Sequence, residues 1–277
     1  MGDSRAERVV ADIAQFERTI GASVSDLLAL DGLQNATDSV YASGSMVEGF
    51  GNKHSDIDIF VVGNSKPRSD GVVIEKEQFA ISIHFLGERR IDFEYWPVEH
   101  VHTIAAQLDG IHVGEDFVAD KLAPVEKLFI HRLKVALPLV NPARLADLRS
   151  LFDWRRFDGY LVQEATHRID GAIEDVWGLM ETGRLLDAAL RAWDIAGFAA
   201  DVGRFAKGET NPLEKWRAAS LARLQTRGAA GAAELLNEFT SLQFPNPPPL
   251  MSADAEVESY VRRCIAFADK AVRDVQG

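Results

Sequence analysis

The sequence lacks the features that mark secreted, disulfide-rich and membrane proteins. It contains one cysteine, Cys264, among 277 residues, so no internal disulfide can form. No stretch approaches the roughly 18 consecutive apolar residues that a membrane-spanning helix needs. Met1–Glu7 has no basic segment leading into an apolar one, which is the pattern of a secretion signal. We therefore expect a cytoplasmic protein with no membrane partner.

Positive charge is also scarce, with 30 Lys and Arg residues against 42 Asp and Glu residues and a formal net charge of −12. A surface with this balance repels the phosphate backbone that dominates nucleic-acid affinity, so we expect no long nucleic-acid partner. The apolar and charged fractions, 47% and 26%, are ordinary for a globular protein. The length is enough for two domains of moderate size.

Hydrophobic spacing divides the chain into two halves. In the first half, Ser4 and Glu7 form a capping box that predicts a helix running to Ile20. Alternating apolar and polar residues then predict four strands, the last two joined as a hairpin at Gly87. These strands cover residues 39–43, 56–62, 78–85 and 90–96.

From Pro142 onward the apolar residues recur at helical spacing. The periodic segments are residues 145–152, 160–180, 185–198, 213–224, 232–242 and 253–275. We expect an α+β fold with a mixed β-sheet domain at residues 1–141 and an all-helical domain at residues 142–277. Pro138–Pro142 is the predicted hinge, and the proline-rich residues 244–250 are a predicted spacer before the last helix.

One stretch of the first half carries residues suited to phosphate and metal chemistry. A predicted strand ends at Gly44-Ser45, and ten residues intervene before Asp56, which is followed two positions later by Asp58. Strand side chains alternate, so Asp56 and Asp58 project from one face. Mg²⁺ prefers one or two carboxylates together with phosphate oxygens and water. Glycine allows close approach of a phosphate, to which the hydroxyls of Ser45 and Ser55 can donate.

A third acid follows on the next predicted strand. Asp92 can complete a three-carboxylate cluster that binds two metal ions and accepts a proton from a hydroxyl nucleophile. Glu94 shares the face of Asp92 and is the alternative third acid. Lys53 and His54, in the loop before the first two acids, are either phosphate contacts or exposed loop residues.

The Gly44-Ser45 pair, the spacer, the Asp56 and Asp58 pair and the later Asp92 together resemble the DNA polymerase beta-like nucleotidyltransferase superfamily. The resemblance implies transfer of a nucleoside monophosphate from a nucleoside triphosphate to a hydroxyl, with release of pyrophosphate. It also implies that the three aspartates bind two Mg²⁺ ions, with Asp92 as third ligand and base. Gly44 and Ser45 would hold the triphosphate.

The helical half resembles the second domain of the small-molecule branch, which includes aminoglycoside and lincosamide nucleotidyltransferases. In that branch a helical domain commonly supplies a lysine to the triphosphate. The basic residues of positions 204–227 favour Lys215, followed by Lys207, for this role. Asn211-Pro212 is predicted to begin a helix with Lys215 in its first turn, where the helix N-terminus favours anions.

These observations favour a Mg²⁺-dependent enzyme that transfers AMP from ATP to a hydroxyl of a small-molecule acceptor. The acidic surface suits a cationic acceptor such as an aminoglycoside. A synthase of oligonucleotide second messengers, a protein-modifying nucleotidyltransferase and an inactive nucleotide-binding protein remain the alternatives.

Overall fold

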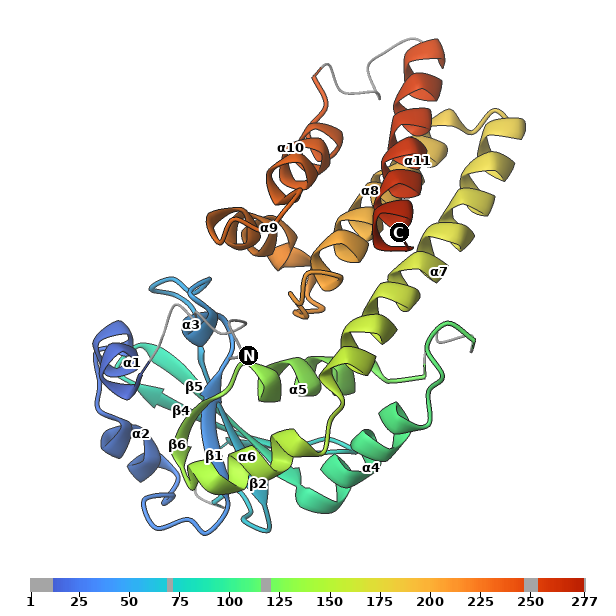
Figure 1. Cartoon of the computed structure of the whole chain (residues 1–277). Helices are drawn as coiled ribbons and strands as arrows, with labels where there is room; N and C mark the ends of the chain where they lie inside the picture. The colour runs from blue at the N-terminus through green and yellow to red at the C-terminus, as the bar shows by residue number, and fades with distance from the viewer. Residues whose placement is uncertain (1–11, 69–71, 116–120, 247–253, 277) are drawn as a thin grey trace. The chain divides into compact units, whose positions relative to one another are not determined.

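The structure is a computed structural model that describes residues 12–68, 72–115, 121–246 and 254–276 (Figure 1). The described residues fall into two compact units. The first unit is drawn from Met1–Gly110 and Leu122–Asp153, and the second from Ile111–Lys121 and Trp154–Gly277. Each unit buries a core of its own.

A mixed sheet of six strands, in the order β3-β4-β5-β2-β1-β6, forms the centre of the first unit. The neighbours β2 and β5 run parallel, and the other described neighbours run antiparallel. The strands are β1 (Ser39–Ser43), β2 (Ile57–Gly63), β3 (Val72–Glu75), β4 (Ala80–Leu86), β5 (Arg89–Pro97) and β6 (Leu137–Val140).

Helices cover both faces of this sheet (Figure 1). The first helix begins where the Asp12 carboxylate accepts a hydrogen bond from the backbone N–H of Gln15, and it ends at Gly21 in the left-handed conformation. The helices of the unit are α1 (Ile13–Ile20), α2 (Val24–Leu30), α3 (Ser45–Glu48), α4 (Val98–Asp109), α5 (Pro124–Lys134) and α6 (Pro142–Ser150).

The strand alternation gives the two sheet faces different roles. One face forms the main core with α1 and α2, and its members include Phe16, Ile20, Leu27, Ile57, Ile59, Ile91 and Phe93. On the opposite face Trp96 packs against Phe129 of α5, with ring centroids 4.3 Å apart. Asp58 and Asp92 alternate with the core residues, so they project from this second face.

The predicted fold class is confirmed, because a mixed sheet with helices precedes a largely helical C-terminal region. The strand at residues 39–43 is β1, and β4 and β5 form the predicted antiparallel hairpin around Gly87. The helix predicted to end at Ile20 is α1 over its described part. The capping box of Ser4 and Glu7 lies outside the described residues.

Two features of the first unit differ from the sequence prediction. The predicted hinge at Pro138–Pro142 is wrong, because Leu137–Val140 form the edge strand β6, which pairs with β1. An edge strand tolerates Pro138 because one of its sides has no neighbouring strand. In addition, β3, α2, α3 and α5 were not predicted, and α6 belongs to the first unit. The predicted domain boundary after residue 141 stays a prediction.

The second unit consists of helices, and α8 packs against α7, α10 and α11. The predicted helical segments of this region are confirmed as α7 (Trp154–Glu181), α8 (Leu185–Phe205), α9 (Arg217–Thr226), α10 (Ala232–Gln243) and α11 (Asp254–Gln276). Cys264 is buried in α11, where burial raises the pKa of its thiol to about 11 and so disfavours the reactive thiolate. Residues 247–250 of the predicted spacer lie outside the described residues. None of the described helices meets the length and hydropathy needed to span a membrane.

A buried ionic cluster holds α8 to α9. Asp201 accepts hydrogen bonds from Arg204 Nε and from Arg217 Nη2, each at 2.7 Å, and all three side chains are buried. The Arg217 guanidinium also lies so close to Gly197 that a Cβ there would be 2.7 Å from Nη1. Gly197 therefore provides the space that this cluster occupies.

Replacing Asp201 with asparagine is expected to lower the free energy of unfolding of the second unit by about 3–5 kcal/mol, since the buried Arg204 guanidinium would lose its ion-pair partner and the buried Arg217 guanidinium would keep only Glu214, at 3.3 Å. Asp187→Asn removes the same charge from the exposed pair with Arg184 and should change stability by less than about 1 kcal/mol. Urea unfolding followed by tryptophan fluorescence measures both, because four of the five tryptophans lie in this unit. Equal effects of the two substitutions would contradict the prediction.

Candidate functional site

The sheet register places two of the predicted acids side by side. Asp58 on β2 pairs with Asp92 on the parallel strand β5, and on its other side Asp58 pairs with Ser43 at the end of β1. All three side chains therefore project from one face in a single row. The carboxyl side chains of Asp58 and Asp92 are 21% and 15% exposed, so they are accessible from solvent but partly enclosed.

The remaining predicted metal ligand, Asp56, precedes the sheet. Asp56 is exposed and lies one residue before β2 begins at Ile57. The hydrogen bond to Asp92 raises the pKa of Arg90, and the charges of Asp56 and Asp58 raise it further. The negative charges of all three carboxylates therefore stabilise the positive charge of the Arg90 guanidinium. Within the described residues, however, no three His, Cys, Asp or Glu side chains are grouped closely enough to hold a metal ion.

The loop before Asp56 is ordered by local hydrogen bonds. Ser55 Oγ accepts a hydrogen bond from the backbone N–H of Asn52 at 2.9 Å. The Ser55 hydroxyl hydrogen is not used in that contact. Lys53 and His54 are exposed in this loop. This placement is consistent both with contacts to phosphate and with a role as exposed loop residues.

The Gly44-Ser45 turn approaches the acids closely. Gly44 has φ 83° and ψ −167°, a conformation that is open essentially to glycine alone. A Cβ on Gly44 would lie 2.0 Å from both Asp58 Oδ2 and Arg132 Nη1. Ser45 is half-buried at the start of the four-residue helix α3. The chain thus needs glycine at this position both for its backbone conformation and for the space beside Asp58.

Two arginines that the sequence analysis missed contact these acids. Arg90 donates from Nε and Nη2 to the two oxygens of Asp92 at 2.6 and 2.8 Å. Arg132 donates from Nη1 to Asp58 Oδ2 at 3.2 Å. Arg90 was detectable, because it lies two positions before Asp92 and so shares its strand face. Arg132 is 74 residues from Asp58 in the chain, and no local pattern connects them.

Two contacts fix Arg132 relative to the glycine turn. Ser43 Oγ donates to the backbone oxygen of Arg132 at 2.9 Å, which ties the end of β1 to α5. The neighbouring His131 Nε2 lies 3.0 Å from Glu48 Oε1 on α3, and both side chains are buried. The position of Arg132 is thus set by contacts with the elements on either side of Gly44.

Glu94, the alternative third acid, lies one row deeper in the sheet. It pairs with Phe60 rather than with Asp58, and it accepts a hydrogen bond from Trp96 Nε1 at 3.1 Å. Burial raises the pKa of Glu94 to about 7, and the negative charges of Asp58 and Asp92 contribute to this increase. Asp92, and not Glu94, is therefore the acid that lies directly beside Asp58 in the sheet.

Most of the positive charge predicted in the second unit is used inside that unit. Arg204 and Arg217 bind Asp201, while Arg223 and Arg227 form ion pairs with Glu209. Lys207 and Lys215 are exposed. Because both lysines belong to the second unit, their role at a triphosphate stays a prediction.

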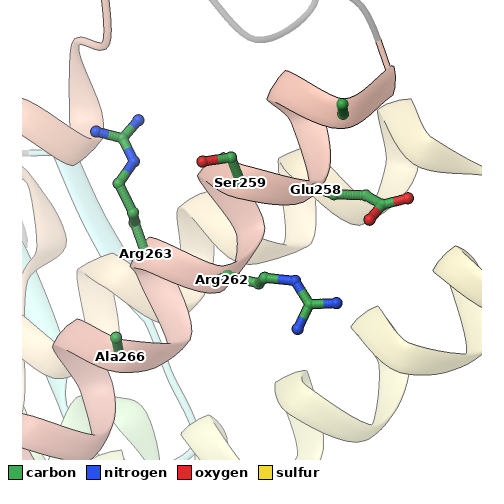
Figure 2. Close-up of a pocket in the computed structure, with 6 residues that line it drawn as sticks. Glu258, Ser259, Arg262, Arg263 and Ala266 are labelled. Atoms are coloured by element: carbon green, nitrogen blue, oxygen red, sulfur yellow. The ribbon is translucent and has the colours of Figure 1, made fainter.

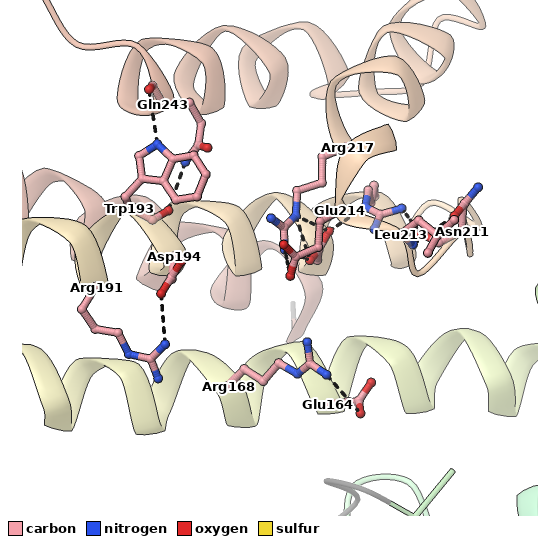
Figure 3. A network of polar contacts seen from close by, with 12 residues as sticks. Glu164, Arg168, Arg191, Trp193, Asp194, Asn211, Leu213, Glu214, Arg217 and Gln243 are labelled. Atoms are coloured by element: carbon pink, nitrogen blue, oxygen red, sulfur yellow. Dashed lines mark hydrogen bonds and ion pairs between the residues drawn. The ribbon is translucent and has the colours of Figure 1, made fainter. Parts of the chain in front are cut away.

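The predicted helix start at Asn211-Pro212 is wrong. Asn211 Oδ1 accepts a hydrogen bond from the backbone N–H of Leu213 at 3.0 Å, and Arg204 binds the backbone oxygen of Asn211. These contacts hold the backbone in a turn, which Figure 3 shows beside Glu214 and Arg217. Lys215 then lies in a short 3₁₀ turn, η2 (Glu214–Trp216), with its ammonium 5.2 Å from the centre of the Trp216 ring. The helix N-terminus therefore no longer supports Lys215 as an anion ligand.

A shallow pocket of about 370 Å³ lies on the second unit (Figure 2). All of its lining residues come from α11, and Arg262 and Arg263 point to opposite sides of that helix (Figure 2). Arg262 lies over the Trp177 ring and Arg263 over the Tyr260 ring. None of the residues predicted to bind the nucleotide or metal lines this pocket.

Comparison with known protein families finds a match within the first unit. Residues 28–107 match the family model described as "Nucleotidyltransferase domain". This range contains strands β1 to β5, the Gly44-Ser45 turn and all three aspartates. Residues 28–107 of the first unit are therefore similar to that family. Helix α5, with Arg132, lies beyond the matched range.

The chain is also similar to a solved structure, titled as the crystal structure of a nucleotidyltransferase-like protein from Exiguobacterium sibiricum 255-15. That similarity covers 94% of this chain and 74% of the other, with 13% sequence identity and a TM-score of 0.44. No curated protein matches the chain. The assignment to the small-molecule branch stays a prediction.

Proposed function

We propose that the chain is a Mg²⁺-dependent nucleotidyltransferase that moves AMP from ATP to a hydroxyl group of a small-molecule acceptor and releases pyrophosphate. The observation that carries this proposal is the pairing of Asp58 with Asp92 on adjacent parallel strands, beside the Gly44 turn. The match of residues 28–107 to a nucleotidyltransferase domain supports it.

The residues of this row fit a metal-nucleotide complex better than an all-protein metal cage. Asp58 and Asp92 offer two partly exposed carboxylates, and Mg²⁺ commonly takes one or two carboxylates and completes its shell with phosphate oxygens and water. Two further observations concern the surroundings of Asp58. Gly44 lets the Asp58 carboxylate and the Arg132 guanidinium lie against the turn, and the buried Nε of Arg132 has no hydrogen-bond partner within the described residues.

The side chains of the first unit would then have distinct tasks. Asp56, Asp58 and Asp92 hold Mg²⁺, which when bound polarises the phosphate and aligns the attacking and leaving oxygens. Asp92 also accepts the proton of the acceptor hydroxyl. The Gly44 and Ser45 backbone and the hydroxyls of Ser45 and Ser55 bind the triphosphate.

The second unit would bind the acceptor and complete the contacts to the triphosphate through Lys215 or Lys207. Their exposure leaves both ammonium groups accessible to an anion. The formal net charge of −12 favours a cationic acceptor, because a field of one sign concentrates ligands of the opposite sign. In this proposal residues 1–141 form the catalytic domain and residues 142–277 the acceptor-binding domain.

Calorimetric titration of the four nucleoside triphosphates, each as the non-cleavable α,β-methylene analogue, tests the proposal. We expect binding of the ATP analogue in Mg²⁺ and none in EDTA. Removal of a residue that only orients a metal ligand weakens metal binding by about 10–100-fold. Asp58→Asn removes a proposed ligand itself, so it should weaken binding of the ATP analogue by more than this. Asp147→Asn, which removes the same charge from an exposed position of α6, should leave binding unchanged. Absence of Mg²⁺-dependent binding by the wild type would contradict the proposed function.

A further inference from the structure

Both acids of the central row are already bound to cations of the protein itself. Arg90 takes both oxygens of Asp92 in a two-bond contact, and Arg132 takes one oxygen of Asp58. A carboxylate oxygen that accepts a hydrogen bond from an arginine has fewer lone pairs available for a metal. A divalent cation and these arginines therefore compete for the same oxygens.

The two contacts differ in how firmly they are held. Arg90 extends from β5 with 40% of its side chain exposed, although its geometry on Asp92 is the planar, two-bond arrangement that suits a guanidinium. Ion pairs with this exposure contribute little to stability, because water solvates both partners when they separate. Displacement of Arg90 from Asp92 by another cation therefore requires little free energy.

Arg132 is held in place, but its contact is incomplete. Its side chain is 12% exposed, its backbone is tied to Ser43, and its single hydrogen bond to Asp58 is 3.2 Å long. Its Nε is buried without a hydrogen-bond partner within the described residues. A buried donor without an acceptor is destabilising, so a ligand oxygen that reached this group would stabilise the site.

We propose that Arg90 and Arg132 are exchangeable counter-ions, which neutralise Asp92 and Asp58 while no metal is bound and which a divalent cation displaces from these carboxylates. The inference rests on the proposed function, because it assumes that the two aspartates bind the metal. Displacement frees two guanidinium groups next to the place where the triphosphate would bind. Binding of the metal then also makes the guanidinium groups of Arg90 and Arg132 available to the triphosphate.

The exchange predicts that removal of either guanidinium strengthens metal binding. Mn²⁺, titrated without nucleotide and followed by electron paramagnetic resonance, measures this without any turnover. We expect Arg90→Gln to bind Mn²⁺ about two- to fivefold more tightly than the wild type, which corresponds to the free energy of one exposed ion pair. Arg132→Gln should bind Mn²⁺ more tightly by at least the same factor, since its pair with Asp58 is less exposed.

Two control variants separate exchange from a general change in charge. Arg89 is next to Arg90 but donates to the backbone oxygen of Ile20, and Arg144 donates to the backbone oxygen of Thr37. Arg89→Gln and Arg144→Gln therefore remove one positive charge each from the same unit without freeing a carboxylate. Tighter binding by Arg90→Gln and Arg132→Gln than by these controls supports the exchange.

The remaining outcomes overturn specific parts of the proposal. Equal or weaker Mn²⁺ binding by the two test variants, relative to their controls, overturns the exchange and leaves the metal site intact. No Mn²⁺ binding by the wild type or any variant overturns the metal site and therefore also the proposed function. If a glutamine variant does not fold, Arg90→Lys replaces it. Lysine keeps the charge but cannot make the two-bond contact, so affinity should again rise above that of the wild type.

Discussion

Gly44→Ala is expected to abolish Mg²⁺-dependent nucleotide binding and to lower the free energy of unfolding of the first unit by about 1–3 kcal/mol. The added Cβ would lie 2.0 Å from Asp58 Oδ2 and from Arg132 Nη1, so both charged groups would have to move. The backbone conformation of Gly44, with φ 83° and ψ −167°, adds strain for any other residue. Calorimetry with the ATP analogue and urea denaturation measure the two effects.

Gly21→Ala provides the matched control. Gly21 also has a positive φ, 72°, but nothing lies within 4 Å of the position that its Cβ would occupy. This variant should lose stability through backbone strain and still bind the nucleotide like the wild type. The comparison isolates the effect of the steric contact with Asp58 and Arg132. Wild-type affinity in Gly44→Ala would show that the turn does not shape the nucleotide site.

The sheet and its central acids could be predicted because their signals are local. Alternation along a strand shows which side chains share a face, and the apolar residues of β2 and β5 show which face is buried. A turn glycine between two alternating segments predicted the hairpin of β4 and β5. The side-by-side position of Asp58 and Asp92 needed one more fact, the parallel pairing of β2 and β5, which no short pattern specifies.

The contacts that surround these acids could not be predicted in the same way. Arg132 reaches Asp58 only because α5 packs against the sheet face that carries Trp96, and that packing is a tertiary effect. The edge strand β6 was interpreted as a hinge because it is short and contains Pro138, both of which weaken a strand signal. In the second unit, the basic residues of positions 204–227 suggested a more basic surface than the structure has. Asp201 lies just outside that range and binds two of its arginines.

The charges of the site are arranged in two layers. Asp58 and Asp92 are paired with arginines, whereas Glu94 is half-buried one row deeper, and loss of solvent around its carboxyl group raises its pKa to about 7. A buried acid with a raised pKa is largely neutral in mildly acidic solution and so adds little negative charge there. The outer row is the partly exposed part of the site, and a cation from solution reaches it before it reaches Glu94.

Asp92→Asn is expected to lower the rate of nucleotidyl transfer by at least about 10²–10⁴-fold, the usual contribution of a general base. Binding of the ATP analogue should weaken less than in Asp58→Asn, because Asp56 and Asp58 retain their charges. Asparagine has nearly the shape of aspartate but cannot accept the proton. Pyrophosphate release from ATP and Mg²⁺, measured with a panel of cationic amino sugars as acceptors, gives the rate.

Glu94→Gln separates the two candidates for the third acid. Glu94 lies on the same strand and face as Asp92 but one row deeper, and its main polar contact is the hydrogen bond from Trp96, which glutamine can still accept. We expect this variant to lose far less activity than Asp92→Asn. The reverse pattern, with a large loss in Glu94→Gln and a small one in Asp92→Asn, would transfer the role of base to Glu94. Because the two substitutions each remove one carboxylate from the same strand, the difference between them reports which row of the sheet the acceptor hydroxyl reaches.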